Sequence, residues 1–181
     1  LCTVHEGAPL LAHVPFVLDE SGAFAELHLA RGNAIVRTNA PSLPATLAVQ
    51  GPHGYVSPDW YGVEEQVPTW NYVAVHIKGR LVPLPQDEIR RVVDGISSEY
   101  EGRLAGKTPW TSAKMTPDVL EKMLIQIVPF RFEIEAMDGT WKLNQNKTPQ
   151  VRASAAEHMD HSAVGSDTAA LAALMRAVKV G

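Results

Sequence analysis

The first half of the chain holds its apolar residues in short segments that end at proline or glycine, and this limits the folds open to it. These segments are rich in Val, Leu and aromatic residues, and none keeps the spacing of a long amphipathic helix. Val14–Leu18 is predicted to be a strand and Asp19–Gly22 a hairpin turn, after which Leu27 and Leu29 return on one face. This half is therefore predicted to be β-structure.

Alternation of apolar and polar residues predicts further strands along the chain. They are expected at Thr46–Gln50, Tyr72–Lys78, Phe130–Glu135 and Thr140–Leu143. Gly79 is expected to end the strand before it. Asp138 and Gly139 separate the last two strands and are typical of a tight turn, so the sequence predicts a hairpin there.

Helical spacing begins at about Gln86. Apolar residues recur at three and four positions over Gln86–Tyr100, which predicts an amphipathic helix. Thr116 and Pro117 resemble an N-cap and a first-turn proline, so a second helix is predicted after them. Its expected buried stripe is Leu120, Met123, Leu124 and Ile127. The tail after Thr148 is also predicted to be helical, with Ser166 as the cap of its last helix.

The order of these elements predicts a β-rich α+β fold, a small antiparallel barrel with helices packed outside it. No internal repeat and no low-complexity linker interrupts the chain, so a single domain is expected over residues 1–181, with a helical tail over about 149–181. The first residue is Leu rather than Met. We therefore expect the native N-terminal strand to be missing from this numbering.

The composition is that of a soluble globular protein. The 181 residues are 45% apolar and 20% charged, with a net charge of −4. The single Cys2 cannot form an internal disulfide, which favours a reducing, cytoplasmic location. No apolar run approaches the roughly 20 residues of a membrane span. The 16 basic residues are dispersed, so direct DNA binding has no electrostatic signature.

Three segments carry more polar and aromatic residues than a core or a turn needs. The first runs from His28 to Asn33, where Arg31 and Gly32 offer a planar cation and flexible backbone donors suited to phosphate or carboxylate. The alternative is a strand end with a solvated arginine.

The second segment combines aromatic rings with hydrogen-bonding side chains. It comprises Gly51–Tyr61 and Val67–Tyr72, and the rings belong to Trp60, Tyr61, Trp70 and Tyr72. Together with Ser57, Thr69 and Asn71, these rings are suited to a flat heteroaromatic ligand. They are equally able to fill the end of a barrel, so both interpretations remain open.

The third segment, Trp141–Lys147, closes the predicted hairpin. It contains two lysines and three carboxamides in seven residues, a set able to bind an anion and the edge of a ring. The alternative is a polar strand exit.

Other chemistries have little support in the sequence. The seven histidines lack the spacing with Cys or carboxylates that marks a metal site. Glycine-rich phosphate loops and the Gly-x-Ser-x-Gly elbow of a serine hydrolase are absent.

Taken together, these segments resemble the PaiB family, which is described as FMN-binding negative transcriptional regulators. The similar motifs are His28–Asn33, Gly51–Tyr61, Val67–His76 and Lys142–Lys147. Their order and spacing match over nearly the whole chain. The resemblance implies an antiparallel split β-barrel with peripheral helices, built as a homodimer with FMN in the subunit interface.

The resemblance also implies which residues contact the cofactor. The expected site residues are His28, Arg31, Asn33, Ser57, Trp60, Tyr61, Thr69, Trp70, Asn71, Tyr72, Lys142, Gln145, Asn146 and Lys147. Arg31, Ser57 and Lys147 are candidates for the phosphate. Trp60, Trp70 and Tyr72 are candidates to pack on the ring, and Asn71, Gln145 and Asn146 to read its pyrimidine edge.

One departure from the family concerns the loop Gly62–Gln66. Family members usually carry a longer loop with a lysine here, so an anion contact from this loop is not expected.

Two functions remain open at this point. The protein is either a flavin-dependent or redox-responsive regulator, or a flavin-dependent oxidoreductase of the pyridoxamine-phosphate-oxidase-like superfamily, because fold and cofactor do not fix function. A dimeric scaffold without flavin affinity is a third reading.

Overall fold

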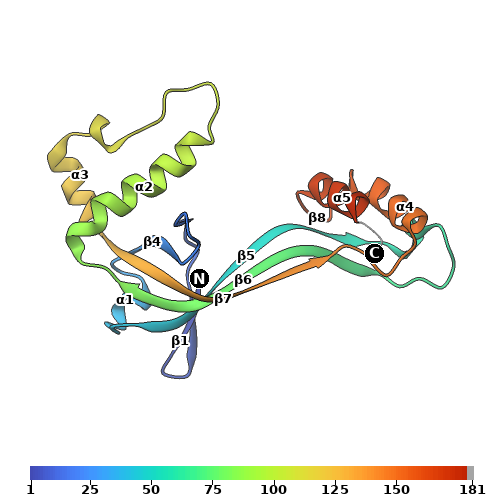
Figure 1. The fold of residues 1–181 in the computed structure, drawn as a ribbon, viewed down its shortest axis with the longest axis horizontal. Coiled ribbons are helices and arrows are strands. Elements are labelled where there is room, and N and C mark those ends of the chain that lie inside the picture. The colour runs from blue at the N-terminus through green and yellow to red at the C-terminus, as the bar shows by residue number, and fades with distance from the viewer. Residues whose placement is uncertain (179–181) are drawn as a thin grey trace. The chain divides into compact units, whose positions relative to one another are not determined.

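Three long antiparallel strands form the centre of the architecture (Figure 1). The structure is a computed structural model that describes residues 1–178. Its strands are β1 (Cys2–His5), β2 (Ala8–Leu11), β3 (Phe16–Leu18), β4 (Phe24–Ala30), β5 (Leu43–Val56), β6 (Thr69–Pro83), β7 (Ile127–Lys142) and β8 (Gly165–Ser166). They form one sheet in the order β2-β1-β5-β6-β7-β4-β3, and β8 pairs with β5.

The helices lie between and after these strands. They are α1 (Ala34–Arg37), α2 (Ile89–Gly102), α3 (Pro117–Leu124), α4 (Pro149–Met159) and α5 (Thr168–Ala177), with short 3₁₀ turns η1 (Pro58–Tyr61), η2 (Gln86–Glu88) and η3 (Ser112–Lys114). The predicted β-rich α+β class is confirmed. No helix within residues 1–178 has the length and apolar character needed to cross a membrane.

The chain forms two compact units, and each of the strands β5, β6 and β7 contributes to both. Unit 1 comprises residues 1–47 and 77–137, and unit 2 comprises residues 48–76 and 138–178. The expectation of a single domain over the whole chain stays a prediction.

In the core of unit 1, alternate residues of the strands are buried, as the pattern of apolar residues in the sequence predicts. Leu27 and Leu29 of β4 are buried, and Phe130 and Phe132 of the neighbouring strand β7 are buried opposite them. The predicted turn at Asp19 is present, because β3 and β4 pair antiparallel across it and the Asp19 carboxylate accepts from the backbone N–H of Phe24. Helix α2 contacts β4.

The core of unit 2 is formed by helices α4 and α5 against the strands of that unit (Figure 1). Met159, Leu171 and Met175 are fully buried beside Val56 and Leu143. The predicted helical tail is thus present as two helices, and its last three residues, 179–181, lie outside the described residues.

The prediction that Gly79 ends a strand is wrong. Strand β6 continues through Gly79 to Pro83. A Cβ atom at this position would collide with the backbone carbonyl of Glu133, so glycine allows a close approach of two backbones.

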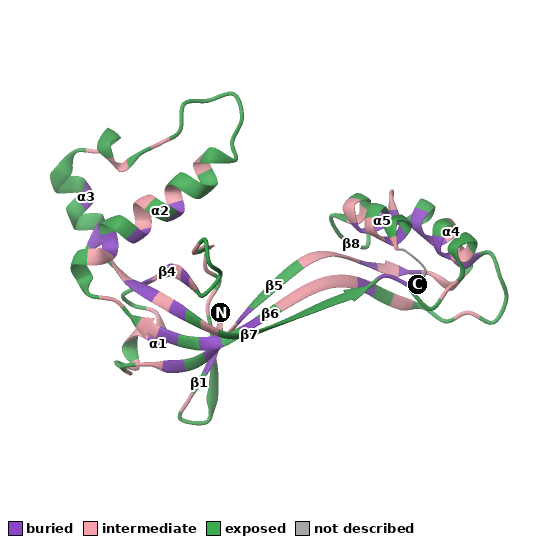
Figure 2. Cartoon of the chain, viewed as in Figure 1, coloured by how far each residue is buried: buried purple, intermediate pink, exposed green. Residues whose placement is uncertain are grey.

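The predicted hairpin at Asp138 and Gly139 is also wrong, since β7 runs as one 16-residue strand through both. Gly139 leaves room for the indole of Trp141, which would otherwise meet its Cβ. All residues from Glu135 to Lys142 are exposed (Figure 2).

Two helix details differ from the prediction. Leu120 and Leu124 of α3 are buried as expected, but Met123 is 57% exposed and Ile127 begins β7. Asp167 occupies the N-cap position of the last helix without a side-chain capping hydrogen bond, and Ser166 lies in β8. The sequence analysis missed the short helix α1 and the hairpin of β1 with β2.

Candidate functional site

Arg31 lies in unit 1 just after the end of β4, where two hydrogen bonds hold its guanidinium. Nε donates to the carbonyl of Ile125 at 2.8 Å, and Nη2 donates to Oε1 of Gln86 at 2.8 Å. Both partners are neutral. No carboxylate within residues 1–178 pairs with this exposed cation, so its charge is available to an anion.

The other two candidates of the first segment have different surroundings. The Asn33 side chain accepts from the N–H of Ile35 at 2.9 Å and caps helix α1. Burial lowers the pKa of His28, and its Nδ1 atom is buried without a hydrogen-bond partner in the described chain. Of these three residues, only Arg31 presents charge at the surface.

A pocket of about 260 Å³ lies beside Arg31 in unit 1. Most of its lining is apolar and comes from α1 and strand ends, including Ile35, Leu43, Leu81 and Phe130. A guanidinium at the edge of an apolar pocket suits a ligand with one anionic group and a hydrophobic body.

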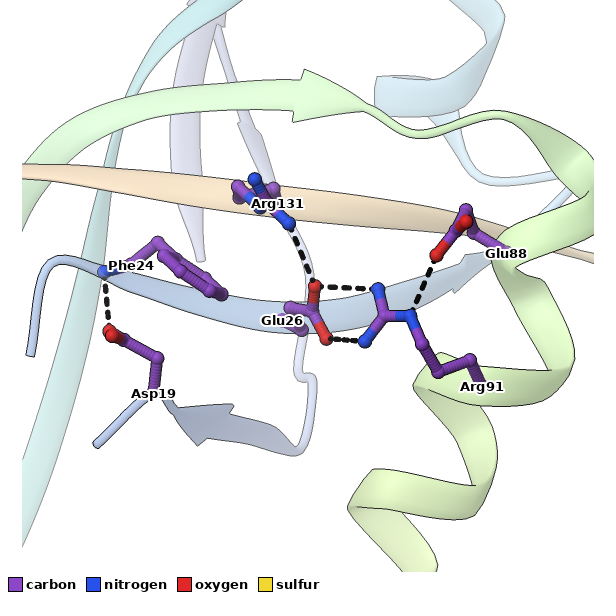
Figure 3. A network of polar contacts seen from close by, with 6 residues as sticks. All are labelled: Asp19, Phe24, Glu26, Glu88, Arg91 and Arg131. Atoms are coloured by element: carbon purple, nitrogen blue, oxygen red, sulfur yellow. Dashed lines mark hydrogen bonds and ion pairs between the residues drawn. The ribbon is translucent and has the colours of Figure 1, made fainter. Parts of the chain in front are cut away.

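Unit 1 also contains a charged network whose members neutralise one another (Figure 3). Glu26 accepts from both terminal nitrogens of Arg91, at 2.7 and 2.8 Å, and from Arg131 at 3.3 Å. Arg91 also pairs with Glu88 at 2.7 Å. These contacts lower the pKa of Glu26, with the hydrogen bond from Arg91 as the largest cause. The network joins α2 to the sheet and leaves little free charge.

The aromatic candidates of unit 2 form two stacked pairs with histidines that the sequence analysis did not select. Trp60 stacks on His158 of α4 with ring centroids 5.7 Å apart, and Trp70 stacks on His53 of β5 at 5.6 Å. Trp70 is 39% exposed, whereas Trp60 is less accessible. Trp70 is therefore the better placed of the two for a planar ligand.

Two other candidates lie in the packed interior of unit 2. Tyr61 is buried, and its hydroxyl donates to Oδ1 of Asn144 at 3.3 Å. Asn71 is fully buried and donates from Nδ2 to the sulfur of Met175 at 3.5 Å. Burial keeps Asn71 out of reach of a flavin in this structure, and its Oδ1 atom has no hydrogen-bond partner in the described residues.

The segment from Lys142 to Lys147 presents two cations with neutral partners. Lys142 Nζ donates to Oγ1 of Thr69 at 2.8 Å. Lys147 Nζ donates to Oε1 of Gln66 at 2.5 Å and lies 5.2 Å from the centre of the Tyr61 ring. Neither ammonium forms an ion pair within residues 1–178, so both retain charge for an anionic ligand.

The remaining candidates are Gln145, Asn146, Tyr72 and Ser57. Gln145 folds back on its own segment, accepting from the N–H of Leu143 and donating to the carbonyl of Trp141. Asn146 is exposed, while Tyr72 and Ser57 are half-buried. Ser57 precedes η1 without capping it through its side chain.

Two buried polar residues near Lys147, Asn144 and Arg152, were not among the expected site residues. Asn144 adopts a left-handed conformation with φ of 60°, which asparagine tolerates better than most residues. Arg152 is buried on α4 and donates to three backbone carbonyls. The motif around Asn144 was noted, but a buried arginine on a helix gives no sequence signal.

These residues fit the phosphate and ring of FMN better than its pyrimidine edge. In unit 1, Arg31 offers charge to a phosphate. In unit 2, Lys142 and Lys147 offer charge, and the exposed indoles of Trp70 and Trp141 offer flat apolar surface. Of the three expected edge readers, Asn71 and Gln145 are engaged in protein contacts and Asn146 is exposed. Nor do the described residues contain a group of His, Cys, Asp or Glu able to hold a metal ion.

A family model described as "Putative FMN-binding domain" matches residues 1–136. The chain belongs to this family. The predicted cofactor, FMN, is the ligand for which the family is described. "Protease synthase and sporulation protein PAI 2" of Bacillus subtilis, which is PaiB, is 34% identical over 80% of this chain and 70% of its own length. The predicted resemblance to PaiB is confirmed.

Other proteins share less of the sequence. An uncharacterised protein of Aspergillus fumigatus is 26% identical over 76% of this chain and 71% of its own length. The FAD and heme binding protein of Mycobacterium smegmatis matches with a TM-score of 0.54 at 18% identity. That match covers 78% of this chain, which spans only 63% of the mycobacterial chain.

A conserved hypothetical protein of Mycobacterium tuberculosis, Rv2991, matches with a TM-score of 0.51 at 13% identity and covers 92% of this chain and 83% of its own. At these identities the two mycobacterial structures bear on the fold alone. They are consistent with the antiparallel split-barrel fold that the sequence predicts.

Proposed function

We propose that this protein binds FMN and acts as a PaiB-like negative regulator of transcription, in which the flavin or its redox state sets the conformation of a homodimer. One observation carries the ligand assignment. Within residues 1–178, the cations that the sequence selects, Arg31, Lys142 and Lys147, hydrogen-bond only to neutral partners, although the chain is acidic overall. Uncompensated cations on a protein of negative charge favour a bound anion such as the FMN phosphate.

Within this proposal, the cations of the two units are separate candidates for the phosphate. Arg31 in unit 1 and Lys147 in unit 2 are the candidates for the phosphate, and Trp70 is the candidate for the ring. When bound, FMN supplies a redox centre that accepts or donates electrons, and the protein supplies orientation and shielding from water.

The proposed homodimer is supported by the exposed part of β7. Every residue from Glu135 to Lys142 is exposed, including the large apolar side chains Met137 and Trp141. A long exposed strand with apolar side chains is suited to pairing with another chain. We propose that a second copy covers it and that the segment Trp141–Lys147 reaches the flavin in the subunit interface.

Dimer formation and flavin affinity should then be linked, because a ligand that touches both chains stabilises only the assembled form. We expect FMN to shift the monomer–dimer equilibrium toward the dimer when sedimentation is followed across dilution. A monomer that binds FMN with unchanged affinity would contradict the interface and return Trp141–Lys147 to a polar strand exit.

The regulatory role rests on similarity to PaiB, and one observation favours the oxidoreductase alternative. Arg90, Arg91, Arg103, Lys107 and Arg131 all pair with carboxylates in unit 1. These cations are not available to DNA phosphates, so regulation through direct DNA contact has little electrostatic support.

Absorption spectroscopy separates the two functions. FMN is added to the purified protein, followed by a reduced nicotinamide. A flavin spectrum that bleaches within seconds favours an oxidoreductase, whereas binding without reduction favours a regulator. Absence of any spectral change on adding FMN would contradict both and favour a scaffold.

A further inference from the structure

Arg152 is the most unusual charged residue in the described chain, because it is buried without a carboxylate partner. Its side chain extends from α4, and the residue is 3% exposed. Nε donates to the carbonyl of Met175 at 2.9 Å, Nη2 to that of Val178 at 3.0 Å, and Nη1 to that of Lys147 at 3.0 Å. All three hydrogen-bond partners are backbone atoms.

Burying a guanidinium costs free energy unless its donors are satisfied, and a carboxylate usually satisfies them. Here the carbonyls of Met175 and Val178 belong to the C-terminal end of α5, where the aligned peptide dipoles give partial negative charge. The third carbonyl, that of Lys147, lies outside any helix or strand. Arg152 therefore links Lys147 to the C-terminal end of α5 through hydrogen bonds.

The loop around Lys147 is held from both sides. The N–H of Lys147 donates to the carbonyl of Asn144 at 3.0 Å, and the carbonyl of Thr148 accepts from the N–H of Arg152 at 2.9 Å. Within residues 1–178, the Lys147 carbonyl accepts its hydrogen bond from the Arg152 side chain. The backbone position of Lys147 thus depends on Arg152.

We infer that Arg152 is a positioning residue for the anion site: it fixes the backbone of Lys147 so that the Lys147 ammonium is held for the phosphate of the flavin. This inference rests on the proposed function. Arg152 itself is buried and does not touch the ligand. Its planar fork reaches three carbonyls at once, which the single ammonium of a lysine cannot do.

The test compares the affinities of FMN and riboflavin, which differ by the phosphate. We expect Arg152→Met to weaken FMN about tenfold, as for the loss of a charged contact, and to change riboflavin affinity less than about twofold. In a Lys147→Met background, Arg152→Met should no longer change the ratio of the two affinities. Arg152→Lys should recover only part of the ratio.

Arg176→Met is the matched control. Arg176 also extends from a helix of unit 2 and donates to the carbonyl of Ala156 and to Asp160, but it has no contact with Lys147. It should leave the ratio unchanged. Equal weakening of both ligands by Arg152→Met, or an undiminished effect in the Lys147→Met background, would overturn the inference.

Amide hydrogen exchange of the flavin-free protein separates this inference from the proposed function. Arg152→Met, and the milder Arg152→Lys, should speed exchange at residues 144–148 while Arg176→Met does not. If the wild-type protein binds no FMN, the proposed function fails, and the exchange still tests the link between Arg152 and Lys147. Unchanged exchange at 144–148 in both Arg152 variants would refute that link.

Discussion

The cations of α2 and those of the segment from Lys142 to Arg152 have opposite surroundings. Arg91 of α2 and Arg103 at its C-cap each pair with a carboxylate, and the Glu26 network extends this pairing to the sheet (Figure 3). Within residues 1–178, Lys142 and Lys147 contact only a hydroxyl, a carboxamide and a ring. Charges that neutralise one another serve the fold, whereas cations without a carboxylate are suited to a ligand that brings its own negative charge.

The largest expected effect concerns Arg31, whose guanidinium also has neutral partners. Arg31→Ala should weaken FMN tenfold to a hundredfold, because losing a charged contact to phosphate costs about 1.5 to 3 kcal/mol. Riboflavin should be affected much less. Titration of both ligands measures this, with Arg37→Ala, an exposed arginine of α1, as the control. If both ligands weaken equally, Arg31 has no role at the phosphate.

For Glu26, whose charge is paired with two arginines, we expect a substitution to change stability rather than FMN affinity. Its side chain is 15% exposed and accepts three hydrogen bonds from two arginines. Glu26→Gln should lower the free energy of unfolding by about 2 kcal/mol, the usual range for hydrogen bonds to charged groups. FMN affinity should be unchanged. Chemical denaturation measures the stability, and flavin titration measures the FMN affinity. Loss of flavin affinity with unchanged stability would show that Glu26 serves ligand binding rather than the fold.

The sequence predicts features that depend on residues close together in the chain. It does not predict features that depend on contacts between residues remote in sequence. Alternation of apolar residues identified the buried face of β4 correctly, because the pattern of a strand is local. Asn71 looked like a ligand-facing residue, yet it is buried by Met175, which lies 104 positions away in the chain. Gly79 and Gly139 were misread as strand ends, because only the folded sheet shows which atoms approach them.

The candidate site shows the same limit. Arg31, Lys142 and Lys147 were selected from residue type, and their neutral partners became visible only in the structure. His53, His158 and Arg152 were not selected. These three residues contact Trp70, Trp60 and Met175, respectively. Because the two residues of each pair are remote in sequence, no local motif identifies them.

A smaller effect is expected when pH is lowered. Arg91 and Arg131 lower the folded-state pKa of Glu26 below its ordinary value of 4.5. The unfolded chain therefore takes up a proton first, and the stability that Glu26 contributes is present above about pH 4.5 and lost as pH falls through the folded-state pKa. Unfolding free energies measured from pH 7 to pH 3 should fall less steeply for Glu26→Gln. Parallel curves would show that the network contributes nothing to acid sensitivity.

The smallest expected effect is on DNA binding. Affinity for a duplex rests largely on cations that neutralise phosphates, and here Arg91 and Arg103 are already paired while the net charge is −4. We expect fluorescence anisotropy at about 150 mM salt to detect no tight complex, since specific complexes reach nanomolar affinity under such conditions. Substituting Glu99→Gln would free Arg103, and even this should raise nonspecific binding only slightly, because one exposed pair contributes little. Nanomolar binding to a particular operator would mean that a basic surface forms in the dimer. It would also show that the protein regulates transcription by contacting DNA directly.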